Sequence, residues 1–498
     1  MSGITKFIAK NWLLLTILTV GLFLRAYKPL SWFMYSHDQD LAGWMVKDIL
    51  VNKHLRLVGQ ETSSQGVFIG PLFYYLQIPF YLLTGMDPAG PLVLGIILGV
   101  FAIYSFYFVF SKIFNQKIGL ISSIIYAISY FVVSIDRDLV PTMPAMLWSV
   151  WYLYSLWLIL KGRSRAYILV GILAALIWNF HLALIIILPL VFVAQIISKK
   201  RLSLGNVFIG LLIFVIIFSP FLVFETRHSF QQTKAIFSSL TTSKNYVPGT
   251  SKGFAKIDRI FQLVRKNTSA LFWGSKAPIP VSWTLYFFTI VFVLLVYKKI
   301  IPFNIGVIFI LWQVIYIMFF SVNSLNPSEY YFNGMNVIWI AILSVAIGYL
   351  VGNKKKKYQK LAIAITILFV GINLFSFFTR GTNKSGYLER KEIVNYINED
   401  ARKYGYPCVA VSYITDPGYK LGYRYLFWLK GMHVNQPISG SPVYTIVFPH
   451  SKVDRIDRSF GALGLIFPDY KRYKKDEVEK SCSGENSNLT DPMFGYTE

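Results

Sequence analysis

The sequence is poor in cysteine and in charged residues. It has two cysteines in 498 residues, Cys408 and Cys482, and charged side chains make up 15% of it. Two cysteines are too few for a disulfide framework, and their spacing is not that of a metal site. An average soluble domain has about 25% charged residues. Here 55% of the residues are hydrophobic and the mean hydropathy is +0.50. These values exclude an ordinary soluble domain.

Acidic residues are also scarce, because 24 Asp and Glu face 49 Lys and Arg, for a net charge of +25. In a soluble protein this excess would indicate nucleic-acid binding. Here many of the cations lie in short loops between long apolar runs, where they would face anionic lipid headgroups. We therefore expect an integral membrane protein with membrane lipid, and not nucleic acid, as its surroundings.

The loops rich in lysine and arginine recur at every second connection between apolar runs. They contain Lys112 and Lys117; Lys161, Arg163 and Arg165; Lys199, Lys200 and Arg201; Lys298 and Lys299; and Lys354, Lys355, Lys356 and Lys357. The positive-inside rule places such loops in the cytoplasm. The pattern predicts a multi-pass plasma membrane protein with its N-terminus inside and its C-terminal part outside.

Eleven apolar runs come close to the roughly 20 residues that a helix needs to cross the hydrocarbon core. They are Asn11–Tyr27, Pro91–Phe110, Gly119–Ile135, Met143–Leu160, Ala166–Phe180, Leu182–Ile197, Asn206–Phe224, Ser282–Tyr297, Pro302–Ser321, Met335–Val351 and Leu361–Phe378. No small-residue cleavage site follows the first run, which we interpret as a retained span and not a signal peptide. The membrane domain is predicted to cover residues 1–378.

A further segment, Val67–Leu83, is apolar enough to cross but is predicted not to. If it crossed, every later basic loop would move to the outside. Its prolines and tyrosines suit a juxtamembrane helix in the interface. Lys28–Gly90 and Glu225–Val281 then form two large outer loops.

The tail, residues 379–498, has balanced charges and short apolar runs, which indicates a small α/β domain outside the cytoplasm. The expected elements are a helix at Leu388–Tyr404, strands at Cys408–Ile414, Val443–Phe448 and Leu463–Phe467, and an amphipathic helix at Tyr419–Met432. Residues after about Lys475 are expected to be poorly ordered. Since an oxidising compartment permits it, we expect a disulfide between Cys408 and Cys482.

Ionisable residues gather in the predicted outer loops. Asp38 and Asp40 follow the first span directly, where they could serve only as a helix cap and a first-turn acid. Alternatively, a carboxylate there could act as a general base. The other outer candidates, proposed to bind substrate, are Asp136, Arg137, Asp138, His181, Glu225, Arg227, His228, Tyr330 and Tyr331. Ionisable groups at the membrane are functional candidates by default, and their convergence on one face indicates a site.

The acidic motif after the first span resembles the first-loop signature of the GT-C superfamily, specifically the family 39 glycosyltransferases. These include protein O-mannosyltransferases and the aminoarabinose transferases that modify lipid A. Gly66–Asp87 is similar to that family's juxtamembrane segment, and Phe224–Phe237 is similar to a segment of bacterial members. One departure is that the usual Asp-Glu pair is Asp38-Gln39 here.

The resemblance implies a GT-C-like fold of about eleven transmembrane helices. It also implies a polyprenyl-phosphate sugar donor and transfer to an acceptor protein, lipid or glycan outside the cytoplasm. In this interpretation Asp38 is the base, with Asp40 as a second catalytic acid. Arg137, His181, Arg227 and His228 are candidates to bind the donor phosphate. No cofactor is required, and a divalent cation at Asp38 and Asp40 is left open.

Two other classes of protein fit part of the pattern. A transporter or flippase of lipid-linked sugars would place its charges near mid-span, with inverted repeats, and the sequence has neither. A non-enzymatic scaffold would bind partners through the tail and would have no need of the acids in the outer loops.

Overall fold

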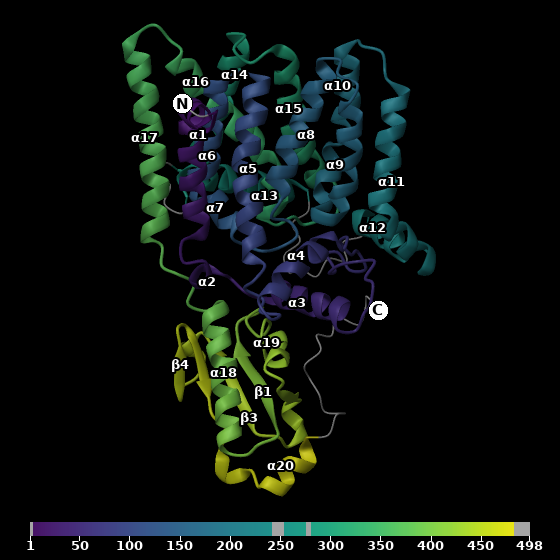
Figure 1. The fold of residues 1–498 in the computed structure, drawn as a ribbon, viewed down its shortest axis with the longest axis vertical. Helices are drawn as coiled ribbons and strands as arrows, with labels where there is room; N and C mark the ends of the chain where they lie inside the picture. Colours follow the sequence, from purple (N-terminus) through teal and green to yellow (C-terminus); the bar gives the residue numbers. More distant parts are fainter. Residues whose placement is uncertain (1–2, 242–252, 275–279, 483–498) are drawn as a thin grey trace.

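The computed structural model describes residues 3–241, 253–274 and 280–482. A bundle of long helices stands over a small domain that contains a β-sheet (Figure 1). The helices of the bundle are α1 (Gly3–Ala26), α5 (Leu92–Ile113), α6 (Gln116–Ile128), α7 (Tyr130–Asp136), α8 (Ala145–Leu160), α9 (Ala166–Phe180), α10 (Leu190–Ser198), α11 (Leu204–Arg227), α13 (Phe254–Trp273), α14 (Val281–Tyr297), α15 (Phe303–Val322), α16 (Asn336–Val351) and α17 (Lys356–Thr379). The predicted class, a polytopic helical membrane protein with a C-terminal α/β domain, is confirmed.

Each of the eleven predicted spans coincides with helical structure, but two of them are broken. The third is α6 and α7, which meet at an angle of 67°. The sixth is a 3-10 helix, η1 (Leu182–Ile187), followed by α10. Within the described residues, five helices are long and apolar enough to cross a membrane alone, and the bent pair would make a sixth. The number of eleven crossings therefore stays a prediction.

The break between α6 and α7 is stabilised by hydrogen bonds from distant helices. Asn373 of α17 accepts a bond from the Tyr130 amide at 2.8 Å and donates one to the Phe272 carbonyl at 2.9 Å. The Ser129 hydroxyl donates to the Leu271 carbonyl at 2.6 Å. Hydrocarbon provides no partner for a free backbone group. These bonds therefore satisfy the Tyr130 amide at the break and connect α13 to it.

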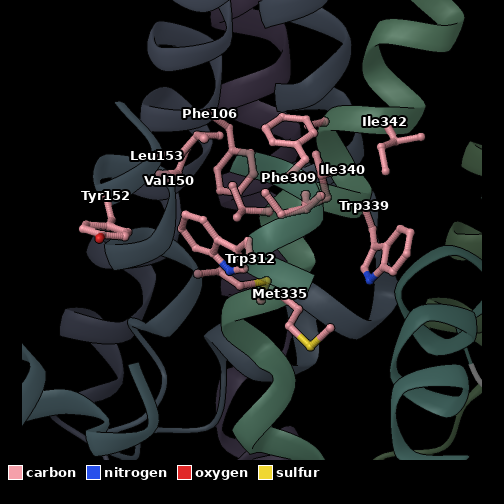
Figure 2. Packing of buried hydrophobic residues seen from close by; sticks show 14 of the residues in the cluster. Phe106, Val150, Tyr152, Leu153, Phe309, Trp312, Met335, Trp339, Ile340 and Ile342 are labelled. Carbon is pink, nitrogen blue, oxygen red and sulfur yellow. The ribbon is translucent and has the colours of Figure 1, made fainter. Parts of the chain in front are cut away.

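The interior of the bundle is packed with large apolar side chains. Phe106 of α5, Leu153 of α8, Phe309 and Trp312 of α15, and Ile340 of α16 meet in one cluster (Figure 2). Trp312 is fully buried and its indole donates to the Gly334 carbonyl at 3.2 Å. The core thus lies between α5, α8, α15 and α16.

The two large outer loops contain helices. The first holds α2 (Pro29–Trp32), α3 (His37–Leu50) and α4 (Leu72–Leu83), and the second holds α12 (Gln231–Thr241) and α13. A 12-residue helix such as α4 is about 18 Å long, too short for a hydrocarbon core of about 30 Å. It lies with α3 at the end of the bundle that faces the small domain (Figure 1), as expected for a segment that does not cross. The sequence did not predict α12 or α13.

The tail forms a five-stranded mixed sheet in the order β2-β1-β3-β5-β4. Its strands are β1 (Cys408–Thr415), β2 (His433–Asn435), β3 (Val443–Phe448), β4 (Arg458–Phe460) and β5 (Leu463–Ile466), and its helices are α18 (Tyr387–Lys403), α19 (Arg424–Leu429) and α20 (Lys475–Ser481). Strand β1 is parallel to β2 and β3, whereas β5 is antiparallel to β3 and β4.

Three predictions for the tail can be compared with these elements. The helix expected at Tyr419–Met432 is shorter, because only Arg424–Leu429 is helical. The prediction of poor order after Lys475 is wrong for the residues up to Cys482, because α20 forms there. The residues after Cys482 lie outside the described part of the chain. The disulfide between Cys408 and Cys482 is confirmed, with the two Cα atoms 5.5 Å apart. It attaches α20 to the start of β1.

Polar contacts hold the tail against the first outer loop. The Asp87 carboxylate accepts hydrogen bonds from the Tyr387 hydroxyl and the Lys391 ammonium, each at 2.6 Å. Burial alone would raise the pKa of Asp87, but these two bonds and the Lys391 charge lower it below its usual value. The carboxylate thus stays ionised and links α18 to the membrane domain.

We expect Asp87→Asn to weaken this link, because Lys391 then loses its charged partner. A hydrogen bond to a charged group contributes roughly 1.5–3 kcal/mol, and the free energy of unfolding in detergent should fall by about that amount. Because the folded state lowers the pKa of Asp87, the same stability should be lost as the pH falls below about 4.

Asp416→Asn is a matched control. It breaks the partly exposed Asp416–Lys452 pair, 2.9 Å long, and such pairs contribute only about 0–1 kcal/mol. Equal losses for the two variants would contradict a specific role for Asp87.

Candidate active site

The start of α3 is fixed by a capping box. Gln39 Oε1 accepts hydrogen bonds from the Ser36 amide at 2.8 Å and from its hydroxyl at 3.0 Å. This pairing is a standard signal for a helix start. It places Asp38 and Asp40 in the first turn, on different sides of the helix, because residues two apart differ by about 200°.

Asp38 is half-buried and is held by the first outer loop. Its Oδ1 accepts a hydrogen bond from Gln60 Nε2 at 3.1 Å. Gln60 is itself fixed, because its Oε1 accepts from the Tyr74 hydroxyl at 3.0 Å. The carboxylate of Asp38 is therefore oriented by α4 through Gln60.

Asp138 lies close to Asp38, although one hundred residues separate them in the chain. Its Oδ1 accepts a hydrogen bond from Gln39 Nε2 at 3.1 Å. Burial, and next the charge of Asp38, raise the pKa of Asp138 to about 7, although the Gln39 bond lowers it. At neutral pH the two carboxyls therefore share a site in which Asp38 has a partly protonated neighbour.

Aromatic residues line the same region. The Tyr330 hydroxyl is 3.1 Å from the Ser63 hydroxyl, and burial, with a smaller contribution from Asp38, raises the pKa of Tyr330. The His181 ring lies 5.7 Å from the Tyr330 ring and 5.1 Å from the Tyr331 ring. Burial lowers the pKa of His181 to about 4, so this imidazole is neutral at pH 7.

Helix α13 adds positive charge beside Tyr330. Lys266 Nζ lies 3.0 Å from the carboxylate of Glu329, the residue before Tyr330. The bond from Lys266, with a smaller effect of the Arg259 charge, lowers the pKa of Glu329. Sequence reasoning missed Arg259 and Lys266, because the whole segment was interpreted as a loop. The apolar positions of α13 at helical spacing, such as Ile260, Val264 and Leu271, were a signal that could have found this helix.

The three charged residues of the 136–138 motif have different surroundings. Asp136 is buried and forms an ion pair with Arg25, whose Nη2 lies 2.5 Å and whose Nε lies 2.9 Å from Asp136 Oδ2. Arg137 donates to the Leu24 and Tyr27 carbonyls and stacks over Trp32, 4.9 Å from the ring centre. Only Asp138 is brought to Asp38. Substrate binding by Asp136 and Arg137 stays a prediction, and their contacts are structural.

Asp40 faces the tail. Its Oδ1 accepts hydrogen bonds from the Tyr35 hydroxyl at 3.0 Å and from the Tyr425 amide of α19 at 3.2 Å, and it is almost fully buried. The structure thus brings Asp138, and not Asp40, to Asp38. The predicted role of Asp40 as a second catalytic acid has no support in this geometry and stays untested.

The candidates at the end of α11 also make structural contacts. Glu225 is buried and accepts hydrogen bonds from the Gln232 amide at 3.0 Å and the Thr233 amide at 2.8 Å, so it caps α12. His228 stacks on Phe224, with the ring centres 4.1 Å apart. Arg227 is exposed and is available to a ligand.

Comparison with known families gives one match. A family model described as dolichyl-phosphate-mannose-protein mannosyltransferase matches residues 69–224, from just before α4 to the last turn of α11. No curated protein matches the chain at a significant level.

Solved structures with a similar fold include those of two proteins from different organisms. ArnT from Cupriavidus metallidurans bound to undecaprenyl phosphate has a TM-score of 0.58 and 10% identity, over 91% of this chain and 98% of that chain. Its apo form has a TM-score of 0.58 and 9% identity, over 94% and 99%. The oligosaccharyltransferase AglB from Archaeoglobus fulgidus, in complex with an inhibitory peptide and a dolichol-phosphate, has a TM-score of 0.50 and 14% identity, over 93% and 75%. The family model over residues 69–224 and the shared fold both agree with the predicted resemblance.

The Asp138 carboxyl should titrate near neutral pH. Difference infrared spectra between the wild type and Asp138→Asn should show a protonated carboxyl that is lost as the pH rises through about 7. In an Asp38→Asn background the midpoint should fall, because the neighbouring negative charge is gone.

Asp454→Asn, which changes an exposed acid of the tail, is the control and should leave the band unchanged. If Asp38→Asn does not move the midpoint, the two carboxyls do not interact.

Proposed function

We propose that this protein is a glycosyltransferase that moves a sugar from a polyprenyl-phosphate donor to a hydroxyl acceptor on the outer face of the membrane. The observation that carries the proposal is the pair of carboxyls, Asp38 and Asp138. They lie at the end of the bundle next to the tail and are held by Gln60 and Gln39. The family model and the shared fold support the same reaction class.

Asp38 is the proposed general base. The acceptor oxygen attacks the anomeric carbon and forms the new glycosidic bond, while the bond from that carbon to the donor phosphate breaks. Asp38 takes the proton of the acceptor hydroxyl. The leaving lipid phosphate is a stable anion and needs no acid, so its main requirement is positive charge and hydrogen bonds around it.

Asp138 is proposed to act on the base and the substrate together. With a pKa of about 7, it exists partly as a carboxylic acid, which can donate a hydrogen bond to a donor or acceptor oxygen. When it is ionised, it places a second negative charge beside Asp38. Both effects need the two carboxyls to remain close, and the Gln39 bond to Asp138 serves this purpose.

The donor phosphate is proposed to lie against cations of the outer face. Arg227 is exposed, and Arg259 and Lys266 lie on α13 beside Glu329 and Tyr330. An arginine can bind a phosphate through two parallel hydrogen bonds. His181 is neutral at pH 7, so it would contribute a hydrogen bond and no charge.

A divalent cation is compatible with the carboxyl pair. Mg²⁺ is often bound by one or two carboxylates together with substrate phosphates and water, and Asp38 and Asp138 could supply the protein ligands. The described residues contain no group of three or more Asp, Glu, His or Cys that could hold a metal alone. A bound cation would stabilise negative charge on the donor phosphate.

The same face is proposed to lie outside the cytoplasm. The basic loops favour this orientation. The Cys408–Cys482 disulfide supports it independently, because disulfides persist in oxidising compartments and are rare in the cytosol.

Asp38→Asn should lower sugar transfer by roughly 10² or more, since it keeps the size of the side chain and removes the base. Donor binding should persist. The measurement is transfer of radiolabelled sugar from a panel of polyprenyl-phosphate donors by the purified protein, with binding of the donor lipid measured separately.

Asp136→Asn tests whether any nearby acid gives the same result. It changes a buried acid of the bundle, so it should act on stability more than on the rate of the folded fraction. Near-normal transfer by Asp38→Asn would show that another group is the base.

The orientation can be tested by cysteine labelling in cells. Cysteines introduced at Lys53 and Gly85 should both react with a membrane-impermeant reagent from outside, whereas one at Arg163 should react only after the membrane is opened. The native cysteines are bridged and should not interfere. Labelling of position 85 from the cytoplasm alone would contradict the proposed topology.

A further inference from the structure

We propose that the C-terminal domain positions the catalytic helix: α19, through Tyr425, holds α3 in the place that directs Asp38 toward Asp138. This inference rests on the proposed function, because it assigns the domain a role in the same site. Tyr425 is a positioning residue in this proposal, since it acts through α3. Figure 1 shows α19 next to α3, at the top of the small domain.

Tyr425 contacts α3 through its backbone and its ring. Its amide donates to Asp40 at 3.2 Å, two residues after Asp38. Its ring lies against Gly43, where an added Cβ would come within 2.8 Å of two ring atoms. It also meets the Trp44 ring edge-on, with the ring centres 6.0 Å apart. Tyr425 thus contacts about one turn of α3, at Asp40 through its amide and at Gly43 and Trp44 through its ring.

The same side chain continues to α4 and the loop after it. Its hydroxyl donates to the Met86 carbonyl at 2.8 Å, and its ring centre lies 6.2 Å from that of Tyr81. Since α4 also orients Asp38 through Tyr74 and Gln60, Tyr425 connects the two helices that determine where Asp38 lies.

The loop before α19 contacts the residue that begins α3. Gly422 has a φ of +86°, and an added Cβ would lie 3.1 Å from the Cα of Ser36. Ser36 is the N-cap of α3. A glycine is needed there both for the left-handed backbone and for the close approach. The tail therefore also packs against the start of α3, two residues before Asp38.

The position of α3 depends on contacts with other elements, and those of the tail are among them. It has 14 residues, a length at which an isolated helix is only marginally stable in water. It is not a continuation of a bundle helix, since α2 and a short non-helical segment separate it from α1. A displacement of about 1 Å at a catalytic group can reduce a rate by roughly 10².

Gly43→Ala tests the proposal, because the added methyl group would push Tyr425 away from α3. We expect kcat for sugar transfer to fall by about tenfold or more, while KM for the donor stays within about twofold, since the proposed phosphate contacts lie on other elements. Gly371→Ala is the matched control. It is also in a helix, and its Cβ would meet nothing within 4 Å, so kcat should be unchanged.

A second substitution separates positioning from a general loss of folding. Tyr425→Leu keeps the backbone amide and makes room for the methyl group. We expect Tyr425→Leu alone to lower kcat a few-fold, and Gly43→Ala to have no further effect in that background, because the two changes act through one contact. Additive losses, or an unchanged kcat in Tyr425→Leu, would overturn the proposal. If Gly43→Ala does not fold, the kcat of Tyr425→Leu alone tests the positioning role.

Hydrogen–deuterium exchange distinguishes this inference from the proposed function. Both variants should raise the exchange of residues 37–50 and leave α16 unchanged. If the wild-type protein transfers no sugar from any polyprenyl-phosphate donor, the proposed function fails, although the exchange result still reports whether Tyr425 holds α3. If transfer occurs and the exchange of α3 does not change in either variant, the positioning role fails alone.

Discussion

The arrangement of this protein depends on one constraint, which is that hydrocarbon offers no hydrogen-bond partner to a free backbone group. Helices satisfy this constraint by themselves, but each break in a helix needs side chains or carbonyls from elsewhere. At the break beside Ser129, the Tyr130 amide donates to the Asn373 side chain, and the Asn373 side-chain amide and the Ser129 hydroxyl donate to carbonyls of α13. The Gly70 amide is covered by the Trp178 carbonyl, at the end of α9. The chain continues from α7 to Asp138 and from the end of α9 to His181. The candidate site therefore lies where helices end or are interrupted.

The departure from the usual Asp-Glu pair has a physical explanation in this structure. The Gln39 side chain caps the start of α3 through Oε1, which accepts from the Ser36 amide, and donates a hydrogen bond to Asp138 through Nε2. A glutamate could cap the helix equally well but would place a third negative charge beside Asp38 and Asp138. It could also donate no hydrogen bond to Asp138 unless it were protonated. The amide therefore allows the two carboxyls to lie close together without a third negative charge beside them.

Much of the fold could be predicted from the sequence, whereas the site could be predicted only in part. Long apolar runs located the helices, and short apolar runs located β1, β3 and β5, because each pattern follows from burial along one element. Asp38 and Asp138 were both among the candidates, but their pairing depends on two loops that the sequence does not place in space. The partner of Asp136 is Arg25, 111 positions away, and nothing local indicates it. Helix α13 was missed because its polar and basic positions concealed its apolar face.

In the motif at residues 136–138, Asp136 and Arg137 make structural contacts, whereas Asp138 lies in the candidate site. Burying Asp136 with Arg25 costs desolvation that the ion pair only partly offsets, so this pair is weak evidence of added stability. Its geometric effect is stronger, because Asp136 contacts Arg25 in the last turn of α1, and Arg137 contacts the Leu24 carbonyl in the same turn and the Trp32 ring beyond it. Asp138 is the next residue, and the hydrogen bond from Gln39 connects it to α3. The contacts of Asp136 and Arg137 thus help to determine where Asp138 lies, and burial there, followed by the charge of Asp38, raises the pKa of Asp138 to about 7.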